Sequence, residues 1–174
     1  MSDSPTNENS FDKQQRELQQ IDLYRDTPIR YLGYANEIGE AFRSMLPIIA
    51  VKATYVIALG YATADALDKS RKEHKKTWPT VEERRKQVGI AAADTFLWQA
   101  LASVAIPGFT INRVCYFTGE LLKRSTRLPV SIQKWTTTFI GLGVIPFIVH
   151  PIDSAVEIGM DKTVRQFYKP TTHL

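Results

Sequence analysis

The chain has 174 residues, of which 44% are hydrophobic and 23% charged, and a single cysteine, Cys115. This length is typical of one domain, and the composition excludes a collagen, a disulfide scaffold, a largely disordered chain and a large transporter with many spans. The formal net charge of +4 is too small to indicate a nucleic-acid-binding protein by itself.

The N-terminal residues 1–20 are polar, and we expect them to form a mobile leader before a single helical domain of residues 21–174. They contain no apolar segment of the kind found in signal peptides. They also carry acidic residues, beginning with Asp3 and Glu8, which cleavable mitochondrial presequences avoid. The sequence therefore predicts no cleavable presequence.

The first predicted helix covers residues 28–46. Thr27 and Pro28 are typical of an N-cap followed by the first helical residue. Beyond them, apolar and aromatic side chains such as Tyr34 and Ile38 recur on one face. We expect this amphipathic helix to lie at a membrane interface, or to pack on the other helices with its polar face in water.

Three long apolar segments are candidates for membrane spans. Residues 95–112 and 135–152 each contain 18 consecutive positions without Asp, Glu, Lys or Arg, which is close to the minimum for a transmembrane helix. The third segment, 44–67, contains Lys52 and Asp65 near its ends, where we expect both side chains to reach water. A soluble bundle is the alternative, but its interior helices seldom stay apolar on all sides for so long.

Start and stop signals divide the second half of the chain into helices. Thr80 and Glu83 form a capping box, which predicts that a helix begins directly after Thr80. Pro107 and Gly108 then predict a tight turn, after which a second leg, residues 109–123, folds back and forms a possible fourth span.

A further helix is predicted to begin after Pro129. Pro146 and Pro151 predict a kink or an end near its far end. Val156 and Met160 then recur at helical spacing. The complete set of predicted helices is 28–46, 47–67, 81–106, 109–123, 130–150 and 154–167.

Basic residues collect in two connectors, residues 68–87 and 123–134. With three spans, the connectors lie on opposite sides of the membrane, against the tendency of basic loops to share one side. With four spans, made possible by a turn at Pro107 and Gly108, the connectors lie together. The sequence leaves both span numbers open and favours the arrangement with the two basic connectors on one side and both termini on the other.

Polar side chains within or beside the spans are candidate structural or lipid-contacting residues. Asp94 follows the basic first turns of its helix, so we expect it to lie near the membrane boundary as an interfacial or inter-helix hydrogen-bond group. An ion pair between Asp94 and Arg113 is rejected, because a turn at Pro107 would leave their depths different by roughly 10 Å. The complete set of candidates is Asp94, Pro107, Gly108, Arg113, Trp135, His150, Asp153, Arg84, Arg85 and Lys86.

The sequence offers no catalytic or metal-binding pattern. Its three histidines and one cysteine lack metal-ligand spacing. His150 and Asp153 resemble a proton-relay pair, although a polar helix end at the membrane interface is the more frequent origin of such a pair. Gly141 and Gly143 lack the strand and third glycine of a dinucleotide loop and indicate close helix packing. We expect a non-enzymatic protein without a cofactor or metal.

The connector 68–87 also bears on partners. Beside a membrane, its basic side chains favour anionic lipids, at about 1 kcal/mol for each Lys or Arg near the surface. Its single aromatic residue, Trp78, is typical of an interfacial anchor and not of a platform for stacked bases. We therefore expect membrane lipids and no nucleic acid as partners.

Three stretches of the chain resemble a known family. They are DLYRDTPIRYLGYANEIGEAFRS (22–44), ADTFLWQALASVAIPGFTINRVC (93–115) and KWTTTFIGLGVIPFIVHPID (134–153). They closely resemble the mitochondrial fission process protein family, over residues 22 to about 168. The resemblance implies a non-enzymatic, multi-pass protein of the mitochondrial inner membrane, needed for mitochondrial division and for inner-membrane integrity, with other inner-membrane proteins as neighbours and no catalytic residues.

Together these features predict an all-α, multi-pass transmembrane helical bundle of three to four spans with an N-terminal amphipathic helix. The alternatives are a small inner-membrane channel or transporter and, less favoured, a soluble helical binding module. A channel would use the polar residues at membrane depth, which are Asp65, Asp94, Arg113, Glu120, His150 and Asp153.

Overall fold

The computed structural model describes residue 24 and residues 28–168, and all regular structure in that part of the chain is helical. The chain divides into two units between Tyr31 and Leu32, and every α-helix of the described residues belongs to the second unit. The predicted leader and the predicted N-cap residue Thr27 lie outside the described residues. The described part confirms the all-α prediction.

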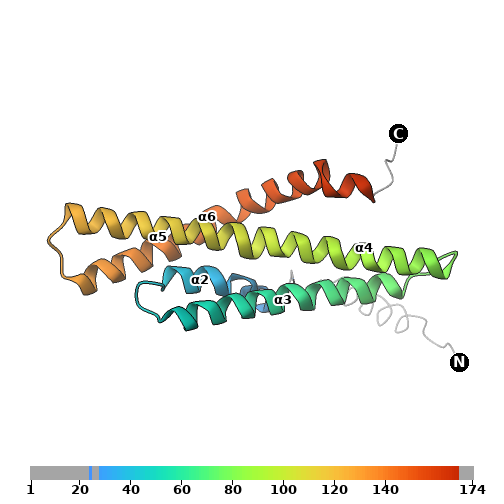
Figure 1. The fold of residues 1–174 in the computed structure, drawn as a ribbon, viewed down its shortest axis with the longest axis horizontal. Helices are drawn as coiled ribbons and strands as arrows, with labels where there is room; N and C mark the ends of the chain where they lie inside the picture. The colour runs from blue at the N-terminus through green and yellow to red at the C-terminus, as the bar shows by residue number, and fades with distance from the viewer. Residues whose placement is uncertain (1–23, 25–27, 169–174) are drawn as a thin grey trace, which may run out of the picture. The chain divides into compact units, whose positions relative to one another are not determined.

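A short helix and three long helical segments make up the second unit (Figure 1). The 3-10 helix η1 (Pro28–Tyr34) leads into the short helix α2 (Ala35–Ala41). The long segments are α3 (Ile48–His74); α4 (Val81–Gln99), the π-helical η2 (Ala100–Ala105) and α5 (Ile106–Ser125), which are continuous; and α6 (Val130–Lys162) with the 3-10 helix η3 (Val164–Phe167).

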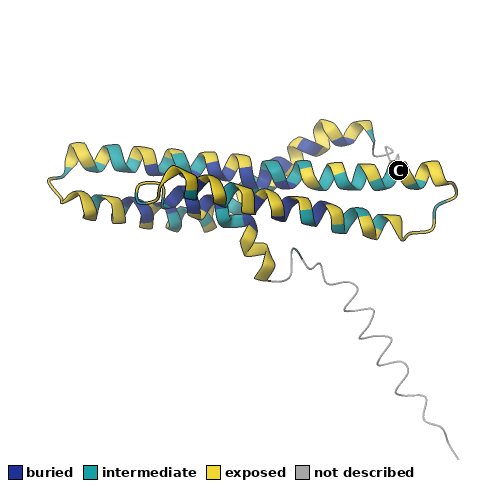
Figure 2. Ribbon diagram, turned by 60° about the horizontal axis from the view of Figure 1, so that its bottom comes forward, coloured by how far each residue is buried: buried dark blue, intermediate teal, exposed yellow. Residues whose placement is uncertain are grey.

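The three long segments are long and apolar enough to cross a membrane. In their most apolar stretches only 22%, 17% and 11% of the residues are buried inside the protein. Figure 2 shows exposed residues along all three segments. Large apolar side chains such as Ile49, Phe109 and Phe147 are 77%, 66% and 78% exposed. An apolar surface of this extent is costly in water, so it favours a lipid environment over the soluble bundle.

The predicted turn at Pro107 and Gly108 is wrong. The chain stays helical from Val81 to Ser125, and both residues are buried within that helix. The π-helical segment η2 ends at Ala105, two residues before the proline. A π turn widens the helix. The wider turn accommodates the proline ring and the absence of the helical hydrogen bond that proline, which lacks an N–H, cannot donate. Residues 109–123 therefore continue the same segment and do not fold back.

This continuity corrects the expected topology. The α3–α4 connection and the α5–α6 connection lie at opposite ends of the bundle (Figure 1). The predicted back-folding leg that would form a fourth span is therefore wrong, and the two basic connectors do not lie at the same end of the bundle. Of the two span numbers left open by the sequence, three is the one that the helices fit.

Helix starts were predicted more accurately than helix ends. Helix α4 begins after Thr80, whose hydroxyl accepts a hydrogen bond from the Glu83 N–H (3.2 Å), and α6 begins after Pro129, which confirms both starts. Pro146 and Pro151 lie inside α6, so neither proline ends the helix. Helix α3 likewise continues beyond its predicted end to His74, into the basic connector.

Small residues allow α2 to pack closely against its neighbours. A Cβ atom added to Gly39 of α2 would lie 2.1 Å from Oγ1 of Thr54 in α3. One added to Gly141 of α6 would lie 2.6 Å from Sγ of Cys115 and 3.1 Å from Cβ of Ala41. Such small residues are typical of helix contacts in membranes, where backbone approach replaces the hydrophobic effect. The prediction of close packing agrees with this geometry at Gly141 but not at Gly143, where an added Cβ atom meets nothing within 4 Å.

We predict that Gly141→Leu lowers the free energy of unfolding by about 1 to 3 kcal/mol, because the new side chain must displace Cys115 and the backbone near Ala41. Gly143→Leu is the control, since a Cβ atom there meets nothing within 4 Å. Thermal unfolding of the purified proteins in detergent measures both. Equal losses in the two variants would contradict the close contact at Gly141.

Candidate functional site

The predicted amphipathic helix packs with its polar face inward and its apolar face outward, the reverse of the prediction. In α2, the polar residues Asn36, Glu37 and Glu40 are 0%, 0% and 1% exposed, whereas Ile38 is 44% exposed. The prediction that the polar face lies in water is therefore wrong for α2. In a lipid environment an apolar face points outward without cost, while polar groups must find partners inside the protein.

The Glu40 carboxylate joins α2 to two other helices. Arg43 donates to it from Nε (2.6 Å) and Nη2 (2.5 Å), Tyr55 of α3 from its hydroxyl (2.9 Å) and Asn112 of α5 from Nδ2 (2.7 Å). Burial alone would raise the pKa of Glu40, but the hydrogen bonds from Arg43, Asn112 and Tyr55 outweigh burial and lower the pKa. Glu40 is therefore a charged group that holds helices together.

Two further hydrogen bonds fix α2 on the long helices. Asn36 donates from Nδ2 to the carbonyl oxygen of Val104 in η2 (3.0 Å). A π-helical turn leaves a carbonyl without its usual helical partner, and an amide side chain supplies one. At the other end of α2, the Thr138 hydroxyl of α6 donates to the carbonyl oxygen of Ala41 (3.0 Å). We call the residues of these bonds the α2 network: Asn36, Glu40, Arg43, Tyr55, Asn112 and Thr138.

Gly108, expected to make a turn, instead borders the α2 network. A Cβ atom at Gly108 would lie 2.7 Å from the Tyr55 hydroxyl oxygen and 2.9 Å from Nδ2 of Asn36. The absence of a side chain therefore lets two hydrogen-bonding groups of the network approach α5. Pro107 beside it is also buried.

A second buried polar group joins α3 to the middle segment. Asp65 is fully buried, and Gln99 donates to its Oδ2 from Nε2 (2.7 Å). Ser103 of η2 in turn donates to Oε1 of Gln99 (2.7 Å), and Nζ of Lys69 lies 3.9 Å from Oδ1 of Asp65. The expectation that Asp65 reaches water is therefore wrong.

Asp94 lies in a cluster that ties α4 to the end of the third segment. Arg165 of η3 donates to both of its carboxylate oxygens, from Nε (2.7 Å) and Nη2 (2.9 Å), and the Tyr168 hydroxyl also donates to it. Arg165 pairs in addition with Glu157 and with Asp161 (3.0 Å). Asp94 thus makes inter-helix hydrogen bonds, with a partner 71 residues away that is not among the predicted residues.

The remaining candidates do not gather in one place. The Arg113 guanidinium is exposed and lies over the rings of Phe109 and Tyr116, 5.6 Å and 5.3 Å from their centroids. Trp135 is half exposed and stacks on Phe139. These are aromatic and cationic side chains on the outer surface of the helices, where they can contact lipid.

His150 and Asp153 both lie on α6, with different surroundings. His150 is exposed, whereas Asp153 is partly buried and its charge reaches Glu37 of α2. No group of three or more His, Cys, Asp or Glu side chains in the described part of the chain is arranged to hold a metal.

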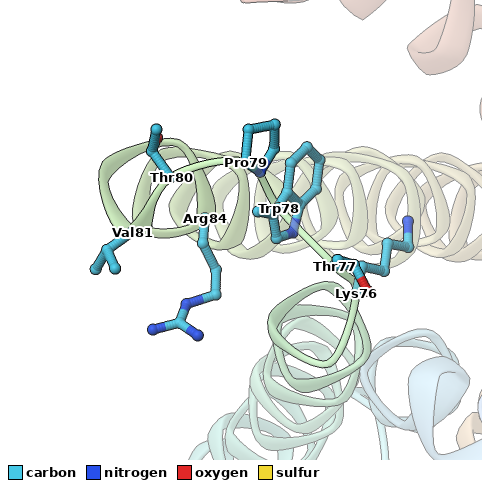
Figure 3. Close-up of a pocket in the computed structure, with 7 residues that line it drawn as sticks. All are labelled: Lys76, Thr77, Trp78, Pro79, Thr80, Val81 and Arg84. Carbon is cyan, nitrogen blue, oxygen red and sulfur yellow. The ribbon is translucent and has the colours of Figure 1, made fainter.

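The basic connector forms a cavity of about 270 Å³ at the start of α4 (Figure 3). Trp78 closes the end of α3 by donating from its indole nitrogen to the carbonyl oxygen of Glu73 (3.2 Å). Arg85 and Lys86 are exposed on the next turn of the helix. Two positive side chains beside this cavity can accept an anionic group. The residues that line it are Lys76, Thr77, Trp78, Pro79, Thr80, Val81 and Arg84.

The residues at the centre of the bundle are not among those predicted from the sequence, although α2 carries a signal for them. Asn36, Glu37 and Glu40 fall on one helical face, next to the small residue Gly39. In a membrane protein, such a face is the one that packs. The prediction from apolar periodicity placed the apolar face inward, as in a soluble protein. No local signal marks Arg165 as the partner of Asp94.

We predict that Glu40→Ala lowers the free energy of unfolding by about 3 kcal/mol or more, since hydrogen bonds to a charged group contribute about 1.5 to 3 kcal/mol each. The control is Glu120→Ala, which removes the pair with Arg124 (2.8 Å) at an exposed site and should cost less than about 1 kcal/mol. Chemical or thermal unfolding in detergent compares them. A loss for Glu40→Ala no larger than for the control would contradict the role of Glu40.

Comparison with known proteins gives consistent matches. A family model described as Mitochondrial 18 KDa protein (MTP18) matches residues 18–160. The chain is 57% identical over 156 residues to Mitochondrial fission process protein 1 of Caenorhabditis elegans, covering 90% of this chain and 94% of the relative. It is 53% identical over 147 residues to the protein of that name from Homo sapiens, covering 84% and 88%. No solved structure matches significantly. These matches confirm the family resemblance.

Proposed function

We propose a function from family membership: the chain belongs to the Mitochondrial 18 KDa protein (MTP18) family, whose matched relatives are named mitochondrial fission process protein. The chain is a non-enzymatic, multi-pass protein of the mitochondrial inner membrane, which takes part in mitochondrial division and in the integrity of that membrane. Its neighbours are membrane lipids and other inner-membrane proteins, and it binds no nucleic acid.

The observation that carries the membrane part of the proposal is the distribution of polar and apolar groups. Large apolar side chains cover the outside of three long helical segments, and charged residues such as Glu40 and Asp65 are buried among them. This distribution suits a lipid solvent, in which each polar group must be satisfied within the protein. The three segments provide three passes through the bilayer.

The cavity at the α3–α4 connection supports the expected contact with anionic lipids. Lys76 and Arg84 line it, Trp78 lies between them in the chain, and Arg85 and Lys86 follow on the same helix. A lipid phosphate at this end of the bundle would meet several positive charges and an aromatic anchor at the headgroup level.

The polar residues at membrane depth support a scaffold over a channel. A channel would leave Asp65 and Asp94 free to line a path for ions. Instead, Asp65 accepts a hydrogen bond from Gln99, and Asp94 is held by two hydrogen bonds from Arg165. These hydrogen bonds connect helices. Both carboxylates would have to break them before they could bind a passing ion.

We predict that cells without this protein have longer and more connected mitochondria, because division fails while fusion continues. Gly108→Leu should fail to restore normal mitochondria and should accumulate poorly, since its side chain displaces groups of the α2 network. Gly89→Leu, on the same long segment but in open space, should restore them. Mitochondrial length in microscopy and protein abundance measure the outcome. Normal mitochondria without the protein would refute the role in division.

We also predict that the protein resists alkaline extraction from mitochondrial membranes, and that its two connectors lie on opposite sides of the inner membrane. Protease-sensitive tags are placed in residues 75–80 and, separately, in residues 126–129. In mitochondria whose outer membrane alone is ruptured, one tag should be cleaved and the other protected. Cleavage of both, or protection of both, would contradict three spans, and alkaline release would refute the integral membrane protein.

A further inference from the structure

Glu37 is a buried acidic residue that the α2 network does not satisfy. Its side chain is 0% exposed, and neither of its carboxylate oxygens has a hydrogen-bond partner in the described part of the chain. Glu40, one turn further along α2, accepts hydrogen bonds from three residues. A buried carboxylate without such partners is strongly destabilised when ionised, and it avoids that cost by binding a proton.

The groups around Glu37 also favour the protonated form. The charge that reaches it from α6 is negative, that of Asp153. From α3 it faces Tyr55, whose hydroxyl is already bound to Glu40, and α5 packs on α2 with the neutral Asn112. On α2 itself, the Glu40 charge is paired with Arg43. The one charged neighbour that acts strongly on Glu37 therefore repels a second negative charge.

We propose that Glu37 and Asp153 form a proton-binding site between α2 and α6, in which Glu37 carries the proton at neutral pH. The site needs no third ligand, because a proton is held by a single carboxyl oxygen. Two carboxylates alone make a poor site for a divalent metal, and the described residues offer no set of three metal-ligating side chains. The proposal concerns the folded protein itself and does not depend on a role in mitochondrial division.

The direction of the pKa agrees with this geometry. Burial, and then the charge of Asp153, raise the pKa of Glu37 from 4.5 to about 8. A carboxyl group whose pKa is higher in the folded state binds its proton more tightly there. Its contribution to stability is fully present below pH 4.5 and is lost as the pH rises through about 8. Deprotonation of Glu37 should therefore weaken the docking of α2 over this pH range.

The test uses infrared difference spectroscopy on the full-length protein purified in detergent. A protonated carboxyl group has a C=O stretching band separate from that of a carboxylate. We expect such a band at about pH 6 that disappears by about pH 9, is absent in Glu37→Gln, and is unchanged in the exposed control Glu120→Gln. In Asp153→Asn the band should titrate at lower pH, with proton affinity weakened about threefold or more, because the repelling charge is gone.

Unfolding measurements give a second readout. The stability of the unmodified protein should fall between about pH 4.5 and pH 8, and Glu37→Gln, which mimics the protonated form, should remove most of that fall. A missing carboxyl band at about pH 6, or a band that Glu37→Gln leaves unchanged, would overturn the proposal. Stability that rises with sodium or potassium concentration, without a carboxyl band, would identify a cation site instead. If Glu37→Gln does not fold, an unshifted band in Asp153→Asn refutes the pairing.

Discussion

The Glu40 carboxylate is the interaction on which the arrangement of the bundle depends. It is almost completely buried and accepts hydrogen bonds from Arg43 in the turn after α2, from Tyr55 of α3 and from Asn112 of α5. Burying a full charge costs several kcal/mol, and this cost is offset only when the charge is paired and fully hydrogen-bonded, as it is here. Because Tyr55 and Asn112 come from two other helices, the full set of hydrogen bonds to Glu40 requires α2, α3 and α5 to meet at one level, and α2 is thereby held among the long segments.

The continuous middle segment, α4 to α5, connects the contacts of Glu40 with a second set of inter-helix contacts at Asp94. Asn112 and Asp94 lie on the same run of helix, 18 residues or roughly 27 Å apart. Asn112 contacts Glu40, whereas Asp94 binds Arg165 at the end of the third segment. A turn at Pro107 would have interrupted the helix that connects these two levels. The π-helical segment avoids the turn, and one of its carbonyl groups accepts the Asn36 amide, so the feature that accommodates the proline also docks α2.

Local signals predicted what local chemistry controls. The helix starts after Thr80 and after Pro129 depend only on residues that are adjacent in the sequence, so a short motif is enough to predict them. The effect of Pro107 depends on the width of the preceding turn, which no short motif encodes. The inward face of α2 depends on whether water or lipid surrounds the bundle. The partner of Asp94 is 71 residues away, and its identification requires the packed helices.

Glu37 and Glu40 show how neighbours decide the state of a buried carboxyl group. Both lie on the same face of α2 and both are almost completely buried. Glu40 has donors on several sides and a lowered pKa, so it stays charged, whereas the strongest charge near Glu37 is the negative one of Asp153. One residue thus fastens α2 at all ordinary pH values, and the other makes the same docking sensitive to a proton. Since Asp94 and Asp65 hold the long segments to one another separately, deprotonation of Glu37 would act on α2 first.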